Sequence, residues 1–251
     1  MNGTAVPNVQ NANDFIVTPQ RFSRLIEDAG VLKDTSTIAV AVSGGPDSMA
    51  LLTMLAEWVG NRGVTLNALT VDHGLRSESA WEAAQVAGWC GKLGIAHTIL
   101  PWLGEKPGSG IQEAARKARY RLLEGWCNAN GCGVLFLGHT MNDQAETFLM
   151  RMNRGSGVDG LAGMPLVSFS DGVRIIRPLL SISKERLKAT LSGRSVGWIE
   201  DPSNKDGRFS RVAIRRQLDR FERMGISIAS VAGAARIFGQ LRADAENDLR
   251  N

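Results

Sequence analysis

Four short apolar segments alternate with amphipathic segments in the first 150 residues, and this alternation most constrains the fold. The apolar segments span 38–42, 65–71, 96–102 and 134–137, and helix-like segments follow them at 49–59, 79–93, 111–128 and 141–153. Strands that are apolar throughout are buried on both faces, which is typical of a parallel sheet covered by helices. We therefore predict an α/β fold with a parallel sheet and helices on both of its faces.

Polar sequences follow three of the four apolar segments directly. These sequences are SGGPDS, VDHGLR and GHTMND, after the first, second and fourth segments. Because ligands of parallel sheets bind beyond the carboxyl ends of the strands, we expect the three sequences to meet at one edge and to form the functional site.

The rest of the chain gives weaker patterns. Residues 1–17 are polar and lack periodicity, so we expect a disordered tail. After the glycine-rich stretch GSGVDGLAGM we expect a strand at 173–176 and a helix that begins at Ser181 or Ser183. From Ser210 onward the sequence is helical and basic.

Composition excludes several classes of protein. With 43% hydrophobic and 22% charged residues, the chain is neither globally disordered nor fibrous. The net charge of +4 permits a polyanionic partner. Three cysteines without metal-ligand spacing indicate a reducing, cytoplasmic setting, and no apolar run is long enough to predict a membrane partner. Nothing in the sequence indicates an oligomeric state.

The first polar sequence has the chemistry of a phosphate-binding loop. It consists of Ser43, Gly44, Gly45, Pro46, Asp47 and Ser48. Its glycines let backbone N–H groups converge on an anion, its serines can donate hydrogen bonds, and the next helix adds its positive end. Asp47 would hold a bridging Mg2+. The loop lacks the lysine of a Walker A motif, which favours binding of pyrophosphate. The alternative is a glycine-rich turn with a serine cap.

Two further groups of residues have helical spacing. Asp143 and Glu146 would share one helix face directed at the expected site, or else form a solvated acidic first turn. Arg116, Arg119 and Tyr120 would share another face. They could bind phosphate or stack on a base, or the arginines could form surface ion pairs.

SGGPDS resembles the signature of the N-type ATP pyrophosphatases, which split ATP into AMP and pyrophosphate. In chain order, VDHGLR, IQEAARKARYRLL, GHTMNDQAETFLMRMNRGSGVDGLAGM, RPLL and WIEDPSN narrow the resemblance to the tRNA(Ile)-lysidine synthetase family, from about Phe22 to Arg215. The resemblance implies a Rossmann-like sheet, and a ligase that uses ATP and Mg2+. Such a ligase adenylates C2 of the wobble cytidine in the CAU anticodon of isoleucine tRNA. The amine of free L-lysine then displaces AMP.

The resemblance also implies roles for individual residues. The implied catalytic residues are Asp47, Asp143 and Glu146, and the implied ATP-binding residues are the loop Ser43–Ser48 with Asp72 and His73. The implied substrate-binding and tRNA-binding residues are Arg116, Arg119, Tyr120, Arg154, Arg211 and Arg215. The chain departs from the family pattern at Asn142, where a second acid is usual, and at Val212, where an asparagine is usual. We assign no metal role to Asn142.

The resemblance implies a catalytic domain over 18–223 and, over 224–251, the start of a linker helix that leads to tRNA-recognition domains in longer members. Two alternative enzymes share the loop chemistry, a tRNA base sulfurtransferase and a small-molecule amidating ligase. The absence of a C-x-x-C pair weighs against the first, and the RGSG…GLAGM and EDPSN elements weigh against the second. Nucleotide or tRNA binding without catalysis is a third alternative.

Overall fold

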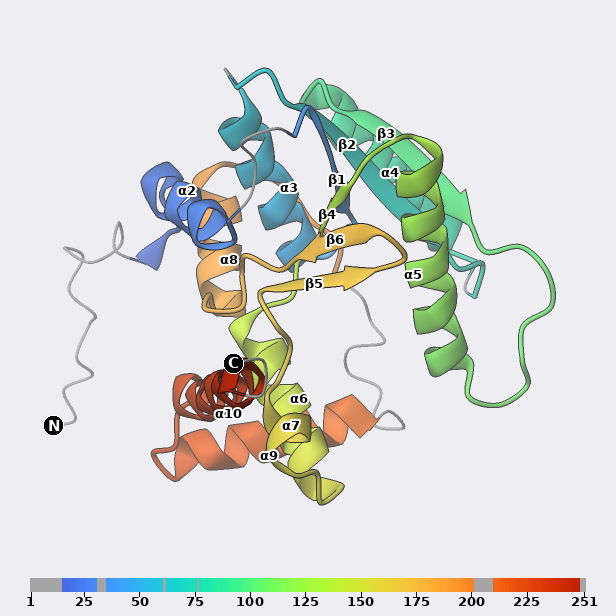
Figure 1. The fold of residues 1–251 in the computed structure, drawn as a ribbon. Helices are drawn as coiled ribbons and strands as arrows, with labels where there is room; N and C mark the ends of the chain where they lie inside the picture. The colour runs from blue at the N-terminus through green and yellow to red at the C-terminus, as the bar shows by residue number, and fades with distance from the viewer. Residues whose placement is uncertain (1–14, 31–34, 61, 76, 201–209, 249–251) are drawn as a thin grey trace, which may run out of the picture.

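The computed structural model describes residues 15–30, 35–60, 62–75, 77–200 and 210–248 (Figure 1). For residues 210, 211, 246 and 247 it describes the backbone alone.

A six-stranded sheet with the order β3-β2-β1-β4-β6-β5 forms the centre of the molecule. The strands are β1 (Thr37–Ala41), β2 (Thr65–Asp72), β3 (Ala96–Pro101), β4 (Val134–Phe136), β5 (Val167–Ser170) and β6 (Val173–Ile176). Strands β1, β2, β3, β4 and β6 all run in the same direction, whereas β5 pairs with β6 in antiparallel register. The strand order changes direction between β1 and β4, which creates the switch point where ligands bind in such sheets.

Helices cover both faces of the sheet. One apolar cluster lies between the sheet and α2 (Pro19–Asp28), α3 (Pro46–Val59), α4 (Ser79–Lys92) and α8 (Lys184–Gly193). A second cluster joins the opposite face to α5 (Ile111–Ala129). The middle of β1, the middle of β2 and all of β4 are therefore buried as their sequences predict, whereas β3, at the edge of the sheet, is half-buried or exposed along its length.

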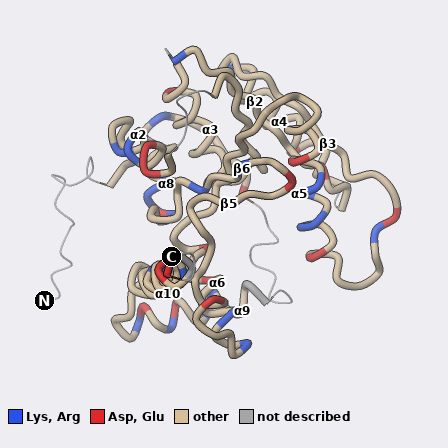
Figure 2. Tube along the Cα trace, viewed as in Figure 1, with Lys and Arg blue, Asp and Glu red and all other residues tan. Residues whose placement is uncertain are grey.

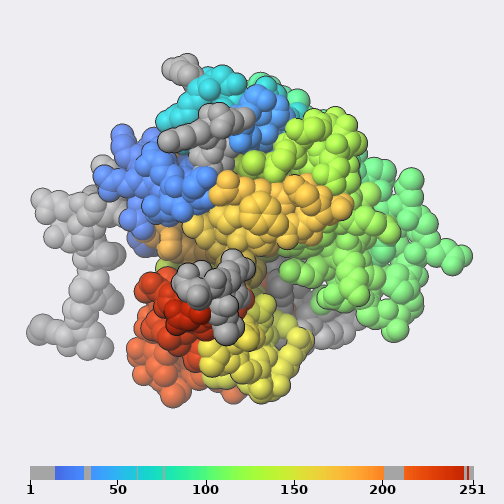
Figure 3. Space-filling view, viewed as in Figure 1, coloured from blue at the N-terminus to red at the C-terminus, as the bar shows by residue number. Residues whose placement is uncertain are grey.

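Four further helices form a layer below the sheet (Figures 1 and 3). They are α6 (Met141–Asn153), α7 (Val158–Leu161), α9 (Ser210–Arg223) and α10 (Ile228–Asp248). A third apolar cluster unites α6, α9 and α10, with Ala145, Leu218 and Ala235 at its centre. The C-terminal helix is thus packed onto α6, the helix that carries two of the predicted catalytic acids.

The predicted α/β fold is confirmed, with two corrections. The sheet is not wholly parallel, because the short edge strand β5 was not expected and lies antiparallel. Residues 1–14 of the predicted tail lie outside the described residues, but Val17 is fully buried, and its N–H donates to Thr190 Oγ1 at 2.9 Å. Among the described helices, no single one is long and apolar enough to cross a membrane. The bent pair α9–α10 meets that criterion only by combined length and composition.

Candidate active site

The loop between β1 and α3 has a tightly closed backbone. Gly44 has a φ of +83°, and a Cβ atom there would lie 2.7 Å from Ile199 Cδ1. Ser48 Oγ accepts the Ser43 N–H at 3.1 Å and donates to the Gly45 carbonyl at 3.0 Å. Ile199, in the WIEDPSN motif, donates its N–H to the Gly44 carbonyl at 2.8 Å. The loop conformation is thus stabilised by Ser48, which belongs to the loop, and by Ile199, which is distant in the sequence.

A second glycine lets the end of β4 approach this loop. A Cβ atom on Gly138 would lie 3.1 Å from the Asp47 carbonyl oxygen and 3.2 Å from Ser48 Cα. Since backbone cannot yield as a flexible side chain can, only glycine fits without displacement. The first and third polar sequences are therefore in contact, as their positions after neighbouring strands predict.

Asp47 and Asp143 face each other across the ammonium group of Lys184. Lys184 Nζ lies 3.5 Å from Asp47 Oδ2 and 3.5 Å from Asp143 Oδ1. Burial raises the pKa of Asp47 to about 6, although Lys184 opposes the shift. Burial alone would lower the pKa of Lys184, but Asp143 and Asp47 raise it above its usual value. The ammonium is thus the internal counter-ion of both carboxylates.

Asp143 has a structural role as well as a place in the site. Its Oδ2 accepts the backbone N–H and the hydroxyl of Thr140, both at 2.8 Å, and the Thr140 hydroxyl accepts the Asp143 N–H. This capping box starts α6. Burial tends to raise the pKa of Asp143, but Lys184 and the bonds from Thr140 outweigh it and lower the pKa. The sequence left a solvated acidic first turn as the alternative. Asp143 does lie in the first turn, where Oδ2 caps the helix, but its side chain is only 13% exposed and Oδ1 faces Lys184.

Glu146 is almost fully buried, and α9 holds it. Arg215 Nε donates to Glu146 Oε1 at 2.6 Å, and only 3% of the Glu146 side chain is exposed. Among the described residues, Glu146 Oε2 has no hydrogen-bond partner. Arg215, predicted to bind substrate, therefore pairs with a predicted catalytic acid.

In the second polar sequence, His73 follows the end of β2 and packs against Trp102, which follows the end of β3. Asp72 Oδ1 accepts the Gly74 N–H, and the Trp102 ring meets His73 edge to face with centroids 5.9 Å apart. Lys106 Nζ lies 4.2 Å from the Trp102 ring centroid. Burial lowers the pKa of His73. Burial therefore favours the neutral form of this imidazole.

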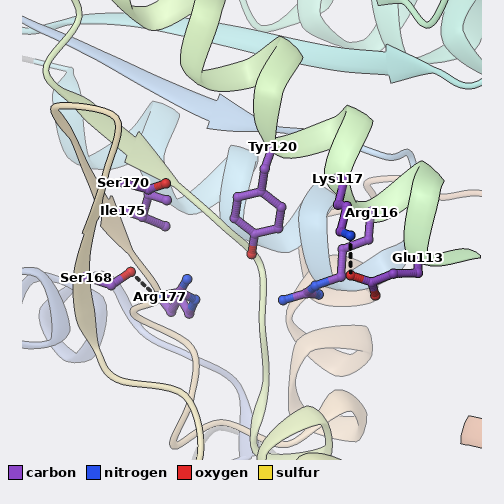
Figure 4. A pocket seen from close by; sticks show the side chains of 8 residues that line it. All are labelled: Glu113, Arg116, Lys117, Tyr120, Ser168, Ser170, Ile175 and Arg177. Atoms are coloured by element: carbon purple, nitrogen blue, oxygen red, sulfur yellow. Dashed lines mark hydrogen bonds and ion pairs between the residues drawn. The ribbon is translucent and has the colours of Figure 1, made fainter.

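A pocket of about 310 Å³ lies between α5 and the β5–β6 hairpin (Figure 4). It is lined by Glu113, Arg116, Lys117, Tyr120, Ser168, Ser170, Ile175 and Arg177. The Arg116 guanidinium carbon lies 5.2 Å from the Tyr120 ring centroid, and that of Arg119 lies 5.7 Å from it. Figure 2 shows Lys and Arg along α5. The predicted grouping of these three residues on one face is thus present.

The structure does not bring Arg154 into this site, and it does not describe the side chain of Arg211. Arg154 ends α6 and is exposed, roughly 16 Å along the helix from Asp143 at 1.5 Å per residue. Arg211 lies in α9, and its side chain is outside the part of the chain that the structure describes. Both assignments remain predictions.

The RGSG…GLAGM element is fixed to α6 by two polar side chains. Gln144 donates to the Met164 carbonyl and accepts the Met164 N–H, both at 2.7 Å. Arg151 Nη1 donates to the carbonyls of Gly160 and Gly163 at 2.8 and 3.0 Å. This glycine-rich element therefore has a defined conformation that α6 imposes.

Two functional candidates escaped the sequence analysis. Lys184 joins the carboxylates, and Arg177 lines the pocket with a buried Nε that has no described partner. A signal for Lys184 was available, because a lysine at the first position of a helix opposes the helix dipole. Arg177 is the first residue of the RPLL motif, but its hydrogen bonds to the Pro165 carbonyl and to Ser168 Oγ depend on the unpredicted strand β5 and the segment that leads into it.

The described residues fit ATP and Mg2+. Gly44 and the two serines form a cradle at a helix N-terminus, and Asp47 Oδ1 is buried without a described partner. No cluster of three or more potential metal ligands occurs among the described residues. Mg2+ is commonly held by one or two carboxylates together with substrate phosphates, and Asp47 and Asp143 suit that arrangement.

A family model described as a PP-loop domain matches residues 16–221. The chain belongs to the PP-loop family. It is 47% identical over 208 residues to a tRNA(Ile)-lysidine synthase from Bradyrhizobium sp. strain BTAi1, covering 81% of this chain and 58% of that protein. It is 44% identical over 219 residues to a tRNA(Ile)-lysidine synthase from Rhodopseudomonas palustris, covering 86% of this chain and 63% of that protein. The chain thus spans about three-fifths of the length of these relatives.

Among solved structures, the PP-loop fold resembles the U34-tRNA thiolase NcsA from Methanococcus maripaludis. The TM-score is 0.75 at 20% identity, over 88% of this chain and 78% of the thiolase. At this identity the likeness concerns the fold alone. The thiolase structure contains a 4Fe-4S cluster, whereas the three cysteines of this chain are buried and lack C-x-x-C spacing.

Proposed function

We propose that this PP-loop protein ligates free L-lysine to C2 of the wobble cytidine in the CAU anticodon of isoleucine tRNA. In the first step, the cytidine C2 oxygen attacks the α-phosphorus of ATP and pyrophosphate leaves. In the second step, the lysine ε-amine attacks C2, and AMP leaves with the former C2 oxygen. The amine loses a proton in that step, so the site needs a group that binds an ammonium and accepts a proton.

The buried carboxylate of Glu146 carries this proposal. Arg215 holds one oxygen in place, while Oε2 is buried without a described partner. A desolvated carboxylate oxygen is costly unless it acquires a donor, and an amine or ammonium is the matching donor. Glu146 also lies close enough to Lys184 to raise the pKa of that lysine, and Lys184 contacts Asp47 next to the phosphate loop. Glu146 would therefore receive the substrate amine beside the activated cytidine.

The remaining roles follow from the positions of the other groups. The loop Ser43–Ser48 would hold pyrophosphate, and Asp72 and His73 would border the adenosine. Mg2+, held by Asp47, would neutralise charge on the phosphates. Arg116, Arg119 and Tyr120 would bind the cytidine and its phosphate, because guanidinium groups bind phosphates and aromatic rings stack on bases.

The names of the relatives support the same reaction, since each is a tRNA(Ile)-lysidine synthase at 44% identity or more. The three buried thiols without a disulfide suit a reducing compartment, so we assign the reaction to the cytoplasm.

The test measures AMP and labelled lysine in tRNA. The protein is incubated with ATP, Mg2+, labelled lysine and an isoleucine tRNA transcript with a CAU anticodon, and a transcript with uridine at the wobble position is the control. We expect AMP and tRNA-bound label with the first transcript alone. Glu146→Gln should lower product formation at least about 100-fold while ATP binding stays within about twofold, because a neutral amide cannot accept the amine proton.

Glu222→Gln removes an exposed acid on α9 and is the matched control. Unchanged turnover in Glu146→Gln would contradict the role of Glu146. Release of ADP instead of AMP would contradict pyrophosphate chemistry itself, and AMP without label in the tRNA would contradict lysine ligation.

A further inference from the structure

Lys184 combines a fixed backbone with a loosely held ammonium. Its N–H donates to Asn142 Oδ1 at 3.0 Å, and the preceding turn is tied to α6 by the Met141 N–H, which donates to the Ile182 carbonyl at 2.9 Å. Its ammonium, in contrast, lies 3.5 Å from each of two carboxylate oxygens. A charge-assisted hydrogen bond is commonly about 2.8 Å long. Lys184 therefore has an anchored Cα and an ammonium that is not committed to either acid.

The side chain also remains accessible from the site. A quarter of it is exposed, although Asp47 and Asp143 lie on either side. An ammonium has three donors, and the two long contacts leave capacity for a further acceptor. An anion that enters the loop next to Asp47 would reach the same ammonium.

The site needs such a cation. The loop 43–48 contains no lysine or arginine but includes Asp47, whose negative charge opposes a polyphosphate. Asp143 adds a second carboxylate close by. Backbone N–H groups and a helix dipole supply only partial positive charges. A full positive charge at the loop must therefore come from a bound ion or from another element.

We propose that Lys184 is the phosphate-binding lysine of this site, supplied by α8 in place of a lysine in the loop. In the nucleotide-free protein its ammonium lies between the carboxylates of Asp47 and Asp143 and offsets part of their negative charge. When ATP binds, the ammonium binds a phosphate oxygen and remains close to the carboxylates. The inference rests on the proposed function for ATP binding alone, and needs neither tRNA nor lysine.

The experiment compares equilibrium binding of ATP and of adenosine, each with Mg2+, by titration calorimetry. Lys184→Met should weaken ATP binding about tenfold or more, because a charge-assisted contact is lost. Adenosine, which lacks phosphate, should bind as it does to the wild type. Lys184→Arg should recover most of the ATP affinity. Lys92→Met removes an exposed lysine at the end of α4 and should leave both affinities unchanged.

ATP binding by Lys184→Met at wild-type strength would overturn the inference, and so would an equal loss of ATP and adenosine binding. A second measurement uses wild-type protein and does not depend on the variant folding. In a brief exposure to acetic anhydride, ATP should slow acetylation of Lys184 while adenosine does not, with Lys92 as internal reference. Equal protection by both ligands, or by neither, would overturn the inference.

The two proposals fail separately. Wild-type protein that binds ATP through Lys184 but forms no lysidine contradicts the proposed function alone. Wild-type protein that forms lysidine while Lys184→Met binds ATP normally contradicts this inference alone.

Discussion

Gly44 and Gly45 are neighbours in the loop, yet alanine should destabilise the protein strongly at the first position and little at the second. Gly44 has a φ of +83°, where a Cβ atom would lie 2.7 Å from Ile199 Cδ1 and 3.1 Å from Val86 Cγ2. Gly45 has a φ of −70°, and its Cβ atom would meet only Ser43 Oγ, at 3.6 Å. The first is a strained and crowded position, while the second is ordinary.

The magnitude for Gly44→Ala follows from two contributions. A left-handed backbone costs a non-glycine residue about 1–2 kcal/mol, and an extra methyl in a filled space costs about 1–3 kcal/mol. We expect the free energy of unfolding to fall by about 2–5 kcal/mol, which is a decrease in Tm of at least about 4 °C for a chain of this size. Gly45→Ala should change the free energy by less than about 1 kcal/mol, since its backbone suits alanine.

Urea denaturation followed by tryptophan fluorescence measures both variants. A double variant, Gly44→Ala with Ile199→Ala, separates the two contributions, because it relieves the main contact but not the backbone strain. Its destabilisation should therefore be smaller than the sum of the single effects. Equal stability of Gly44→Ala and Gly45→Ala would refute the reasoning from φ and contact distance, and so would strict additivity in the double variant.

Three further predictions test the surroundings of the site. Asn142→Ala removes the acceptor for the Lys184 N–H and should cost about 1 kcal/mol in urea denaturation, whereas Asn142→Asp should stay near wild type. Gln144→Leu leaves two Met164 backbone groups unpaired, so it should cost about 2–4 kcal/mol and speed proteolysis before Met164; unchanged cleavage would argue against this tether. Burial raises the pKa of Cys90 from 9.0 to about 11, so the folded protein retains a proton that the unfolded chain releases. Stability should fall by up to about 3 kcal/mol as the pH rises from about 9 to 11, and Cys90→Ala should flatten that slope.

The centre of the sheet was predictable because strands buried on both faces, as β1 and β4 are, have continuous apolar sequences. Each of the four apolar segments became a parallel strand, and the polar sequences after the first and fourth are now in contact through Gly138. Strand β5 left no such trace, because it has four residues at the sheet edge and exposes Phe169. Short edge strands lack the length that periodicity needs.

The ion pair between Glu146 on α6 and Arg215 on α9 could not be predicted from the sequence, for a different reason. The spacing of Asp143 and Glu146 correctly placed both on α6 facing the site, since helix geometry is local. The partner of Glu146 is Arg215, and their contact depends on how α9 packs on α6. Arg215 was selected as a residue that binds substrate, but no spacing rule could assign it to a particular acid.

The one missed residue that the sequence could have revealed is a residue that breaks a local rule. Lys184 is the first residue of α8, directly after the Ser183 N-cap. A positive charge at this end of a helix interacts unfavourably with the helix dipole and costs about 0.3–1 kcal/mol of stability. The cost is offset only in three dimensions, where Asp47 and Asp143 both lie 3.5 Å from the ammonium. A helix start that would be more stable with an acid, yet carries a lysine, indicates that the lysine serves the site and not the helix. The same reasoning separates Lys184 from Lys188, one turn later, which pairs with the exposed Glu200 and violates no rule.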